Sequence, residues 1–235
     1  MGLKLEKPLN TYIDHTLLRP DATTQDFATF LHEAEKYKFA SVCVAPYMAF
    51  PMQELKNILK TPVRVGTVVG FPHGNIPLLF KVQQVDYFLS HGVREIDFVI
   101  NVSELKSQNF AYIIKEVRTL GDLCKQAGAV SKCIIEACLL TQGEKETMFQ
   151  YVHDFSNVDY IKTSTGFSTG GASLEDVRLF KSMRSYGRPL IKAAGGIRTL
   201  EQALGFIEAG ADRLGTSNSV RIMEDFFEYE RNSNT

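Results

Sequence analysis

Two segments of the chain place a lysine at the end of a short apolar run and continue into small residues and glycine. One is Tyr160-Ile161-Lys162-Thr163-Ser164-Thr165-Gly166, and the other is Leu190-Ile191-Lys192-Ala193-Ala194-Gly195-Gly196. A lysine inside a strand is unfavourable because burial removes water from its ammonium group. Two lysines in this setting, each before a glycine turn and the start of a helix, therefore indicate chemistry at the ends of strands.

The chemistry that two neighbouring amines favour is covalent. A second ammonium group and partial burial both lower the pKa of a lysine, and the unprotonated amine can attack a carbonyl. The product is a Schiff base, whose protonated form withdraws electrons from the adjacent carbon. A C–C bond next to it can then break or form without a metal. The spacing leaves open whether Lys162 or Lys192 is the nucleophile.

The elements that must position these lysines alternate along the whole chain. Apolar runs typical of strands are expected near residues 12–14, 41–44, 63–70, 95–101, 132–137, 160–163, 190–193 and 212–215. A helical run follows each of them. No linker divides the chain, and no GxGxxG follows the first strand, which argues against a Rossmann fold. The pattern predicts one α/β domain over residues 1–235, a (β/α)8 TIM barrel.

Three local features of this pattern are also predicted. A short N-terminal helix over residues 3–9 is expected to act as a lid. Pro51 is expected in the first turn of the helix that ends at Leu59, since proline is well tolerated there. The helix after the fourth strand is expected to run unbroken to about Ala127. Ser173 and Thr199 are expected to cap the helices that follow the sixth and seventh strands.

Inward-facing positions of the predicted barrel are unusually charged. Side chains of a barrel strand alternate between the interior and the surrounding helices. The interior positions would hold three carboxylates and three ammonium groups: Asp14, Asp97 and Glu136 with Lys132, Lys162 and Lys192. Such a set could simply fill the barrel as an ion-pair network. Catalysis is favoured because all six are expected toward the carboxyl ends of their strands, where barrel enzymes act. Asp97 is the best-placed acid/base, with Asp14 in support.

Composition excludes several other classes of function. The net charge of −1 gives no field that would attract nucleic acid or an anionic membrane surface. No apolar run approaches the roughly 20 residues of a membrane-spanning helix. The histidines show no HxxxH or HxH spacing, so we expect neither a metal site nor a cofactor. Four cysteines without a CxxC pair suit a reducing compartment, and the N-terminus lacks a signal-peptide core, which predicts a cytoplasmic protein.

Glycine-rich turns after the last strands are suited to bind phosphate. They are Gly195-Gly196-Ile197-Arg198-Thr199 and Gly215-Thr216-Ser217-Asn218-Ser219, and Thr165-Gly166 adjoins them. Glycine lets backbone N–H groups approach an anion, and the N-terminus of a helix adds a favourable dipole. Taken singly, each could be an ordinary turn with a helix cap. Together they favour a phosphorylated aldehyde or sugar as the substrate.

With these residues in place, the chain resembles the deoxyribose-phosphate aldolases, a class I aldolase family, over nearly its whole length. The matching segments are Asp14-His15-Thr16-Leu17-Leu18, Gly66-Thr67-Val68-Val69-Gly70-Phe71-Pro72, Glu95-Ile96-Asp97-Phe98-Val99-Ile100-Asn101, Ile161-Lys162-Thr163-Ser164-Thr165-Gly166-Phe167, Ile191-Lys192-Ala193-Ala194-Gly195-Gly196-Ile197-Arg198 and Leu214-Gly215-Thr216-Ser217. The resemblance implies reversible cleavage of 2-deoxy-D-ribose 5-phosphate to D-glyceraldehyde 3-phosphate and acetaldehyde. It implies that Lys162 forms the Schiff base, that Lys192 lowers its pKa and transfers protons, and that Asp97 is the acid/base.

The resemblance also implies a set of substrate-binding residues: Thr16, Thr165, Gly166, Gly195, Gly196, Gly215, Ser217 and Asn218. Two positions depart from the family's pattern. Phe167 stands where some members carry a lysine that helps to hold phosphate, and Asn218 replaces a serine. Both changes concern phosphate affinity rather than the Schiff base. A homodimer or homotetramer is expected, as is common among small barrels of this type.

Three rival functions remain open at this stage. A phosphate-binding barrel isomerase would use Asp97 or Glu136 to abstract a proton, with the lysines stabilising an enolate. A Schiff-base aldolase for another sugar phosphate would share the chemistry and differ in its loops. A non-catalytic sugar-phosphate binder would release no aldehyde.

Overall fold

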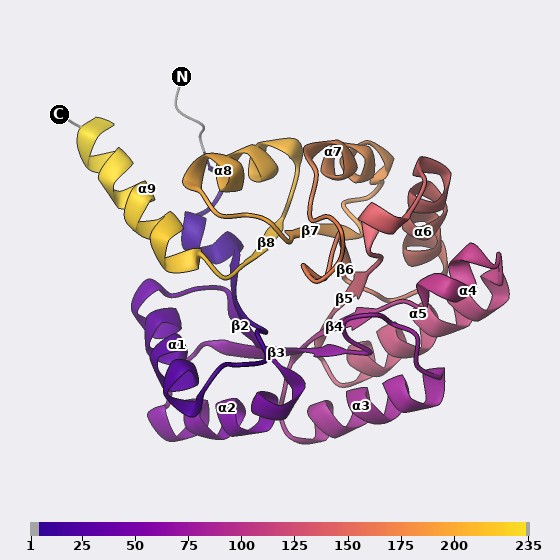
Figure 1. The fold of residues 1–235 in the computed structure, drawn as a ribbon, viewed down its shortest axis with the longest axis horizontal. Coiled ribbons are helices and arrows are strands. Elements are labelled where there is room, and N and C mark those ends of the chain that lie inside the picture. The colour runs from indigo at the N-terminus through magenta and orange to yellow at the C-terminus, as the bar shows by residue number, and fades with distance from the viewer. Residues whose placement is uncertain (1–4, 234–235) are drawn as a thin grey trace.

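The structure, a computed structural model that describes residues 5–233, is a closed barrel of eight parallel strands (Figure 1). The strands are β1 (Ile13–Leu17), β2 (Ser41–Val44), β3 (Arg64–Val69), β4 (Glu95–Val99), β5 (Val130–Ile134), β6 (Tyr160–Lys162), β7 (Leu190–Ala194) and β8 (Arg213–Thr216). Each strand pairs with its neighbour in sequence, and β8 closes the ring by pairing with β1. The predicted (β/α)8 barrel is confirmed.

Helices surround the barrel as a ring in chain order (Figure 1). They are α1 (Thr24–Tyr37), α2 (Pro46–Leu59), α3 (Leu78–Ser90), α4 (Val102–Lys106), α5 (Phe110–Gln126), α6 (Gln142–Phe155), α7 (Leu174–Met183), α8 (Leu200–Ala209) and α9 (Ser219–Ser233). Two short 3-10 helices, η1 (Leu9–Tyr12) and η2 (Ala137–Leu139), complete the set. No helix within residues 5–233 is both long enough and apolar enough to cross a membrane.

The apolar core lies between the strands and this ring of helices. Ile96 and Phe98 of β4, Ile161 of β6 and Ile191 of β7 belong to it, as the predicted alternation requires. Fully burying a side chain of this size contributes about 1.5–3 kcal/mol. The positions between them face the barrel interior, and that is where the charged residues gather.

Helix starts are determined by local side chains. The hydroxyl of Ser173 accepts a hydrogen bond from the backbone N–H of Asp176, and Thr199 does the same for Gln202. Both predicted caps are therefore confirmed. Thr199 and Gln202 form a reciprocal capping box, which holds the first turn of α8 beside the turn that follows β7.

Three local predictions were wrong. Residues 5–8 form no helix, and the 3-10 turn begins only after Pro8; residues 3 and 4 lie outside the described part of the chain. Pro46, not Pro51, occupies the first turn of α2, and Pro51 lies within that helix. The chain between β4 and β5 forms two helices, because Gln108 has a φ of 58° and the Asn109 side chain caps the start of α5.

Gly74 is the most tightly enclosed glycine of the loops around the barrel. It lies in the turn between β3 and α3, with a φ of +69°, and a Cβ added there would lie 1.8 Å from the backbone oxygen of Ile100. Gly128 has a similar φ of +64°, but an added Cβ would meet nothing within 4 Å. The two positions therefore separate steric overlap from backbone strain.

We predict that Gly74→Ala lowers the free energy of unfolding by at least about 3 kcal/mol, since the loop must move away from β4. Gly128→Ala should lower it by only about 1–2 kcal/mol, the strain of a left-handed alanine. Denaturant unfolding of both variants measures the difference. Equal losses would show that the close approach of Gly74 to Ile100 is not tight in solution.

Candidate active site

One carboxylate joins the two lysines that the sequence singled out. Lys162 Nζ and Lys192 Nζ each lie 2.8 Å from Oδ2 of Asp97, and both donate hydrogen bonds to it. Lys132 Nζ lies 2.8 Å from the other oxygen of Asp97, Oδ1. The ladder places Lys162 directly beside Lys192, on β6 and β7. The two amines therefore face a common point in the barrel, as predicted.

Asp14 holds the second side of this cluster. Its Oδ2 lies 2.5 Å from Lys192 Nζ, and its Oδ1 accepts hydrogen bonds from Arg213 at 2.6 Å and from Ser41 at 2.7 Å. Lys132 Nζ also donates to Glu95 at 2.6 Å. Glu95 and Arg213 were not among the predicted site residues. The alternation along the strands could have indicated that both side chains point inward. Glu95 precedes the inward-facing Asp97 by two residues, and Arg213 precedes Gly215 by two.

Glu136 does not join the cluster, which corrects the prediction. β5 ends at Ile134, and Glu136 has a left-handed backbone with a φ of 51°, so the alternation of the strand no longer applies. Its carboxylate accepts hydrogen bonds from the backbone N–H of Thr165, at 3.2 Å, and from the Thr165 hydroxyl. Glu136 thus supports the turn after β6.

The positions of the charged residues along their strands also differ from the prediction, which placed all six toward the carboxyl ends. Of the six expected charges, only Lys162 is the last residue of its strand. Asp14 is the second residue of β1, and Asp97, Lys132 and Lys192 are each the third of their strands. The cluster therefore fills the middle of the barrel, and Lys162 stands at its upper end.

The balance of charges in the buried cluster allows one lysine to be neutral. Among the residues that the structure describes, the buried cluster has four cationic side chains, Lys132, Lys162, Lys192 and Arg213. It has three carboxylates, Asp14, Glu95 and Asp97. If Lys162 is unprotonated, three positive charges face three negative ones. An unpaired buried charge is costly, so this composition favours the neutral form of one amine.

The surroundings of the two lysines favour the neutral form at Lys162 rather than at Lys192. Burial lowers the pKa of Lys162, and the ammonium of Lys192 lowers it further, which together outweigh the attraction of Asp97. Burial also acts against the Lys192 ammonium, but Asp14 and Asp97 outweigh it and raise the pKa of Lys192. Burial acts against the Asp97 carboxylate as well, yet Lys132, Lys162 and Lys192 hold its pKa well below its usual range. Of the two predicted amines, Lys162 is therefore the one whose surroundings lower its pKa and favour the unprotonated form.

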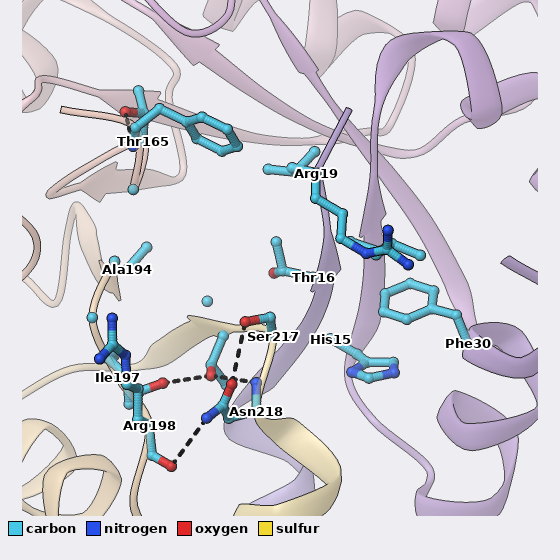
Figure 2. A pocket seen from close by; sticks show the side chains of 18 of the residues that line it. His15, Thr16, Arg19, Phe30, Thr165, Ala194, Ile197, Arg198, Ser217 and Asn218 are labelled. Carbon is cyan, nitrogen blue, oxygen red and sulfur yellow. Dashed lines mark hydrogen bonds between the residues drawn. The ribbon is translucent and has the colours of Figure 1, made fainter. Parts of the chain in front are cut away.

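A cavity of about 610 Å³ opens above Lys162. The predicted substrate-binding residues line it: Thr16, Thr165, Gly166, Gly195, Gly196, Gly215, Ser217 and Asn218 (Figure 2). Asp14, Asp97 and Lys192 are absent from its wall and lie beneath its floor. Lys162 is therefore the one predicted catalytic residue that a bound molecule would touch directly.

The two glycine turns form one wall of this cavity. The Thr216 hydroxyl donates to the backbone oxygen of Ile197 at 2.7 Å, and the Asn218 amide donates to that of Arg198 at 3.4 Å (Figure 2). These bonds tie the turn after β7 to the turn after β8. The N-termini of α8 and α9 follow the two turns, so backbone donors and helix dipoles converge on this wall.

Several residues of the cavity were not among the predicted site residues, although Arg198 belongs to a turn predicted to bind phosphate. Arg19, Phe30 and Arg198 line it together with His15 (Figure 2). Burial lowers the pKa of His15 to about 3, so the ring is neutral, and it stacks on Phe30 with centroids 3.8 Å apart. Phe167 packs edge-to-face against Phe71 at 5.2 Å at the rim. The residues that the structure describes include no group of three His, Cys, Asp or Glu arranged to hold a metal ion.

Comparisons with known proteins agree with this geometry. A model of the DeoC/LacD family of aldolases matches residues 9–220. The chain belongs to this family. Deoxyribose-phosphate aldolases from Thermococcus gammatolerans and Desulfitobacterium hafniense (strain DCB-2) are 44% and 45% identical to it. The matches cover 91% and 90% of this chain, and 94% and 95% of the relatives.

Solved structures of similar proteins share the whole barrel. An aldolase called QR15 superposes with a TM-score of 0.87 at 35% identity, over 94% of this chain and 97% of that one. The tetrameric deoxyribose phosphate aldolase from Aeropyrum pernix superposes with a TM-score of 0.84 at 32% identity. That match covers 93% of this chain and 90% of the other. The family's barrel is therefore complete here.

We predict that Lys192→Leu shifts the rising limb of kcat/KM to higher pH. The ammonium of Lys192 lowers the pKa of Lys162, so its removal raises that pKa, and a higher pH is then needed to free the attacking amine. The matched control is Lys192→Arg, which keeps the charge and should leave the limb close to that of the wild type. A pH profile of Lys192→Leu that coincides with the wild type would contradict the pairing of the two amines.

Proposed function

We propose that this chain cleaves 2-deoxy-D-ribose 5-phosphate reversibly to D-glyceraldehyde 3-phosphate and acetaldehyde, through a Schiff base on Lys162. The observation that carries the proposal is the position of Lys162: its buried amine shares Asp97 with a second lysine and faces a cavity that the two glycine turns wall on one side. The family and the relatives at about 44% identity support the same reaction. The enzyme is a lyase that needs no metal for this chemistry.

Lys162 begins the reaction as a neutral amine. Its Nζ attacks the aldehyde carbon C1 of the open-chain sugar, and loss of water from the adduct gives the protonated imine. The imine draws electrons from the C2–C3 bond, which breaks as the C3 hydroxyl gives its proton to water in the cavity and becomes the aldehyde of glyceraldehyde 3-phosphate. The enamine that remains takes a proton back from water at C2, and hydrolysis of the resulting imine releases acetaldehyde and restores the amine.

Asp97 and Lys192 serve this sequence from beneath the floor of the cavity. Asp97 stays ionised because the ammonium groups of Lys132 and Lys192 lie beside it, and Lys192 stays protonated beside Asp14 and Asp97. When Lys162 becomes an imine, Lys132 and Lys192 still hold the Asp97 carboxylate in place. We assign the proton exchange at the Nζ atom of Lys162, which Oδ2 of Asp97 contacts at 2.8 Å, to this Asp97–Lys192 pair, with Asp14 in support.

The far end of the cavity would hold the phosphate of the sugar. Gly166, Gly195 and Gly196 all have positive φ values, so their backbones bend in a way that other residues resist. The N-termini of α8 and α9 and the Arg198 guanidinium supply positive charge on the same wall. Phe167 adds no charge, so Arg198 takes the part that the family's lysine has elsewhere.

The isomerase alternative has less support. Its proton-abstracting carboxylate would have to reach the bound sugar. Asp97 lies beneath the floor and is bound by three lysines, while Glu136 accepts both of its main hydrogen bonds from Thr165. Neither residue lines the cavity.

The cytoplasmic location and the homodimer or homotetramer stay predictions. Cys43, Cys124, Cys133 and Cys138 are all free thiols, which is compatible with a reducing compartment.

We predict that borohydride treatment in the presence of acetaldehyde leaves a stable ethyl group on Lys162, identified by peptide mapping. Lys162→Leu should bind no acetaldehyde and should lose all detectable cleavage of deoxyribose 5-phosphate in a coupled assay. The matched control is Lys145→Leu, on the outer helix α6, which should be modified like the wild type. An ethyl group on another lysine, or none in an active enzyme, would overturn the Schiff-base assignment.

We further predict that Arg198→Met raises KM for deoxyribose 5-phosphate by about tenfold, the value of one charged hydrogen bond. Because the variant keeps the Schiff base, its kcat/KM for unphosphorylated deoxyribose should equal that of the wild type. Arg178→Met, an exposed arginine of α7, is the control and should change neither value. If Arg198→Met lowers kcat/KM by the same factor for the phosphorylated and the unphosphorylated sugar, Arg198 does not bind the phosphate.

A further inference from the structure

A second fully buried ion pair lies outside the site described above. Lys81 of α3 and Glu116 of α5 have no exposed side-chain surface, and their Nζ and Oε1 atoms are 2.6 Å apart. The pair joins two of the surrounding helices, between which and the strands the apolar core lies. Burying two charges costs several kcal/mol each before their attraction is counted, so an apolar pair would fill this space as well or better.

The polar ends of both side chains bind the backbone at the carboxyl end of β4. Lys81 Nζ donates a hydrogen bond to the carbonyl oxygen of Val99 at 2.7 Å. Oε2 of Glu116 accepts one from the backbone N–H of Asn101 at 2.8 Å. Between them, the N–H of Ile100 donates to Ile134 of β5 at 3.0 Å. Three consecutive residues just beyond Asp97 are thus held by directed hydrogen bonds.

The same pair supports the turn that follows β3. A Cβ added to Gly70 would lie 2.9 Å from Cε of Lys81, so the backbone of the turn packs directly against the aliphatic part of the Lys81 side chain. Gly74 of the same turn touches Ile100, as described above. The turn carries Phe71, which packs on Phe167 at the rim of the cavity. Lys81 and Glu116 therefore connect the ends of β3 and β4 to two parts of the site.

The position of β4 matters because three lysines bind one of its side chains. Asp97 lies two residues before Val99, and its oxygens lie 2.8 Å from Lys132, Lys162 and Lys192. A strand end that could slide would let the carboxylate move toward one amine and away from another. A displacement of about 1 Å at a reacting group costs on the order of a hundredfold in rate. An apolar pair could fill the volume but could not bind the Val99 carbonyl or the Asn101 N–H.

We propose that Lys81 and Glu116 are positioning residues for the reaction: their ion pair fixes the carboxyl end of β4, so that Asp97 stays shared between Lys162 and Lys192. The inference rests on the proposed function, because its effect is measured in aldolase kinetics. It predicts that the pair matters for kcat and for the protonation of Lys162, and much less for phosphate binding.

The test replaces the pair by apolar residues of similar volume, in K81M/E116L, so that no single charge is left buried. We expect kcat for deoxyribose 5-phosphate to fall by about 10- to 100-fold, with KM changed less than about threefold. The rising limb of kcat/KM should move to lower pH, since Asp97 raises the pKa of Lys162 and would no longer be held against it. A purely structural pair would lower thermal stability without moving that limb.

The matched control is K145M/D176L. Lys145 of α6 and Asp176 of α7 form an ion pair of the same 2.6 Å length, and neither side chain binds a strand. This control should keep the kcat and pH profile of the wild type. Glu116→Gln, which keeps the side-chain size, is a milder variant in case K81M/E116L does not fold; it should lose part of kcat and shift the limb in the same direction.

Equal kcat and equal pH profiles in K81M/E116L and its control would overturn the inference. So would failure of both Glu116→Gln and K81M/E116L to fold, because the pair would then be needed for the barrel itself. A wild-type enzyme that acquires no ethyl group from acetaldehyde and borohydride would overturn the proposed function instead. The two failures are therefore distinguishable.

Discussion

The carboxylate of Asp97, shared by Lys132, Lys162 and Lys192, is the interaction on which the rest of this structure depends. It binds the amino groups of all three lysines within one barrel interior. Its attraction raises the pKa of Lys162, but burial and the charge of Lys192 outweigh it and lower that pKa. Such surroundings favour the unprotonated, nucleophilic form of a buried lysine.

The charged cluster and the predicted phosphate-binding turns lie at different levels along the barrel axis. The charged cluster lies within the strands, where the surrounding apolar core excludes water and strengthens every electrostatic interaction. The glycine turns and helix N-termini lie above the strands, where backbone donors are free to meet an anion. Lys162, as the last residue of β6, belongs to both levels.

The outer layer of the fold contributes more than apolar packing. Lys81 and Glu116 bind the backbone beyond Asp97, and Glu136 binds the turn beyond Lys162. Each uses a buried polar side chain at the end of a strand that carries a charged residue of the cluster. Polar groups in such places are expensive, and their directed hydrogen bonds are what distinguishes them from apolar side chains of the same size.

The sequence by itself determined the barrel and the central members of its site. The alternation of apolar and amphipathic runs is local, so eight strand–helix units could be counted, and a lysine before small residues and glycine marked Lys162 and Lys192. Local rules failed where a single residue interrupts a pattern: Gln108 divides one expected helix into two, and the left-handed backbone of Glu136 turns it out of the cluster. Only the tertiary structure showed that Glu95 and Arg213 join the cluster and that the surroundings of Lys162 lower its pKa. The alternation along one strand indicates which side chains point inward. Which of those charges meet at distances below 4 Å depends on strands far apart in sequence.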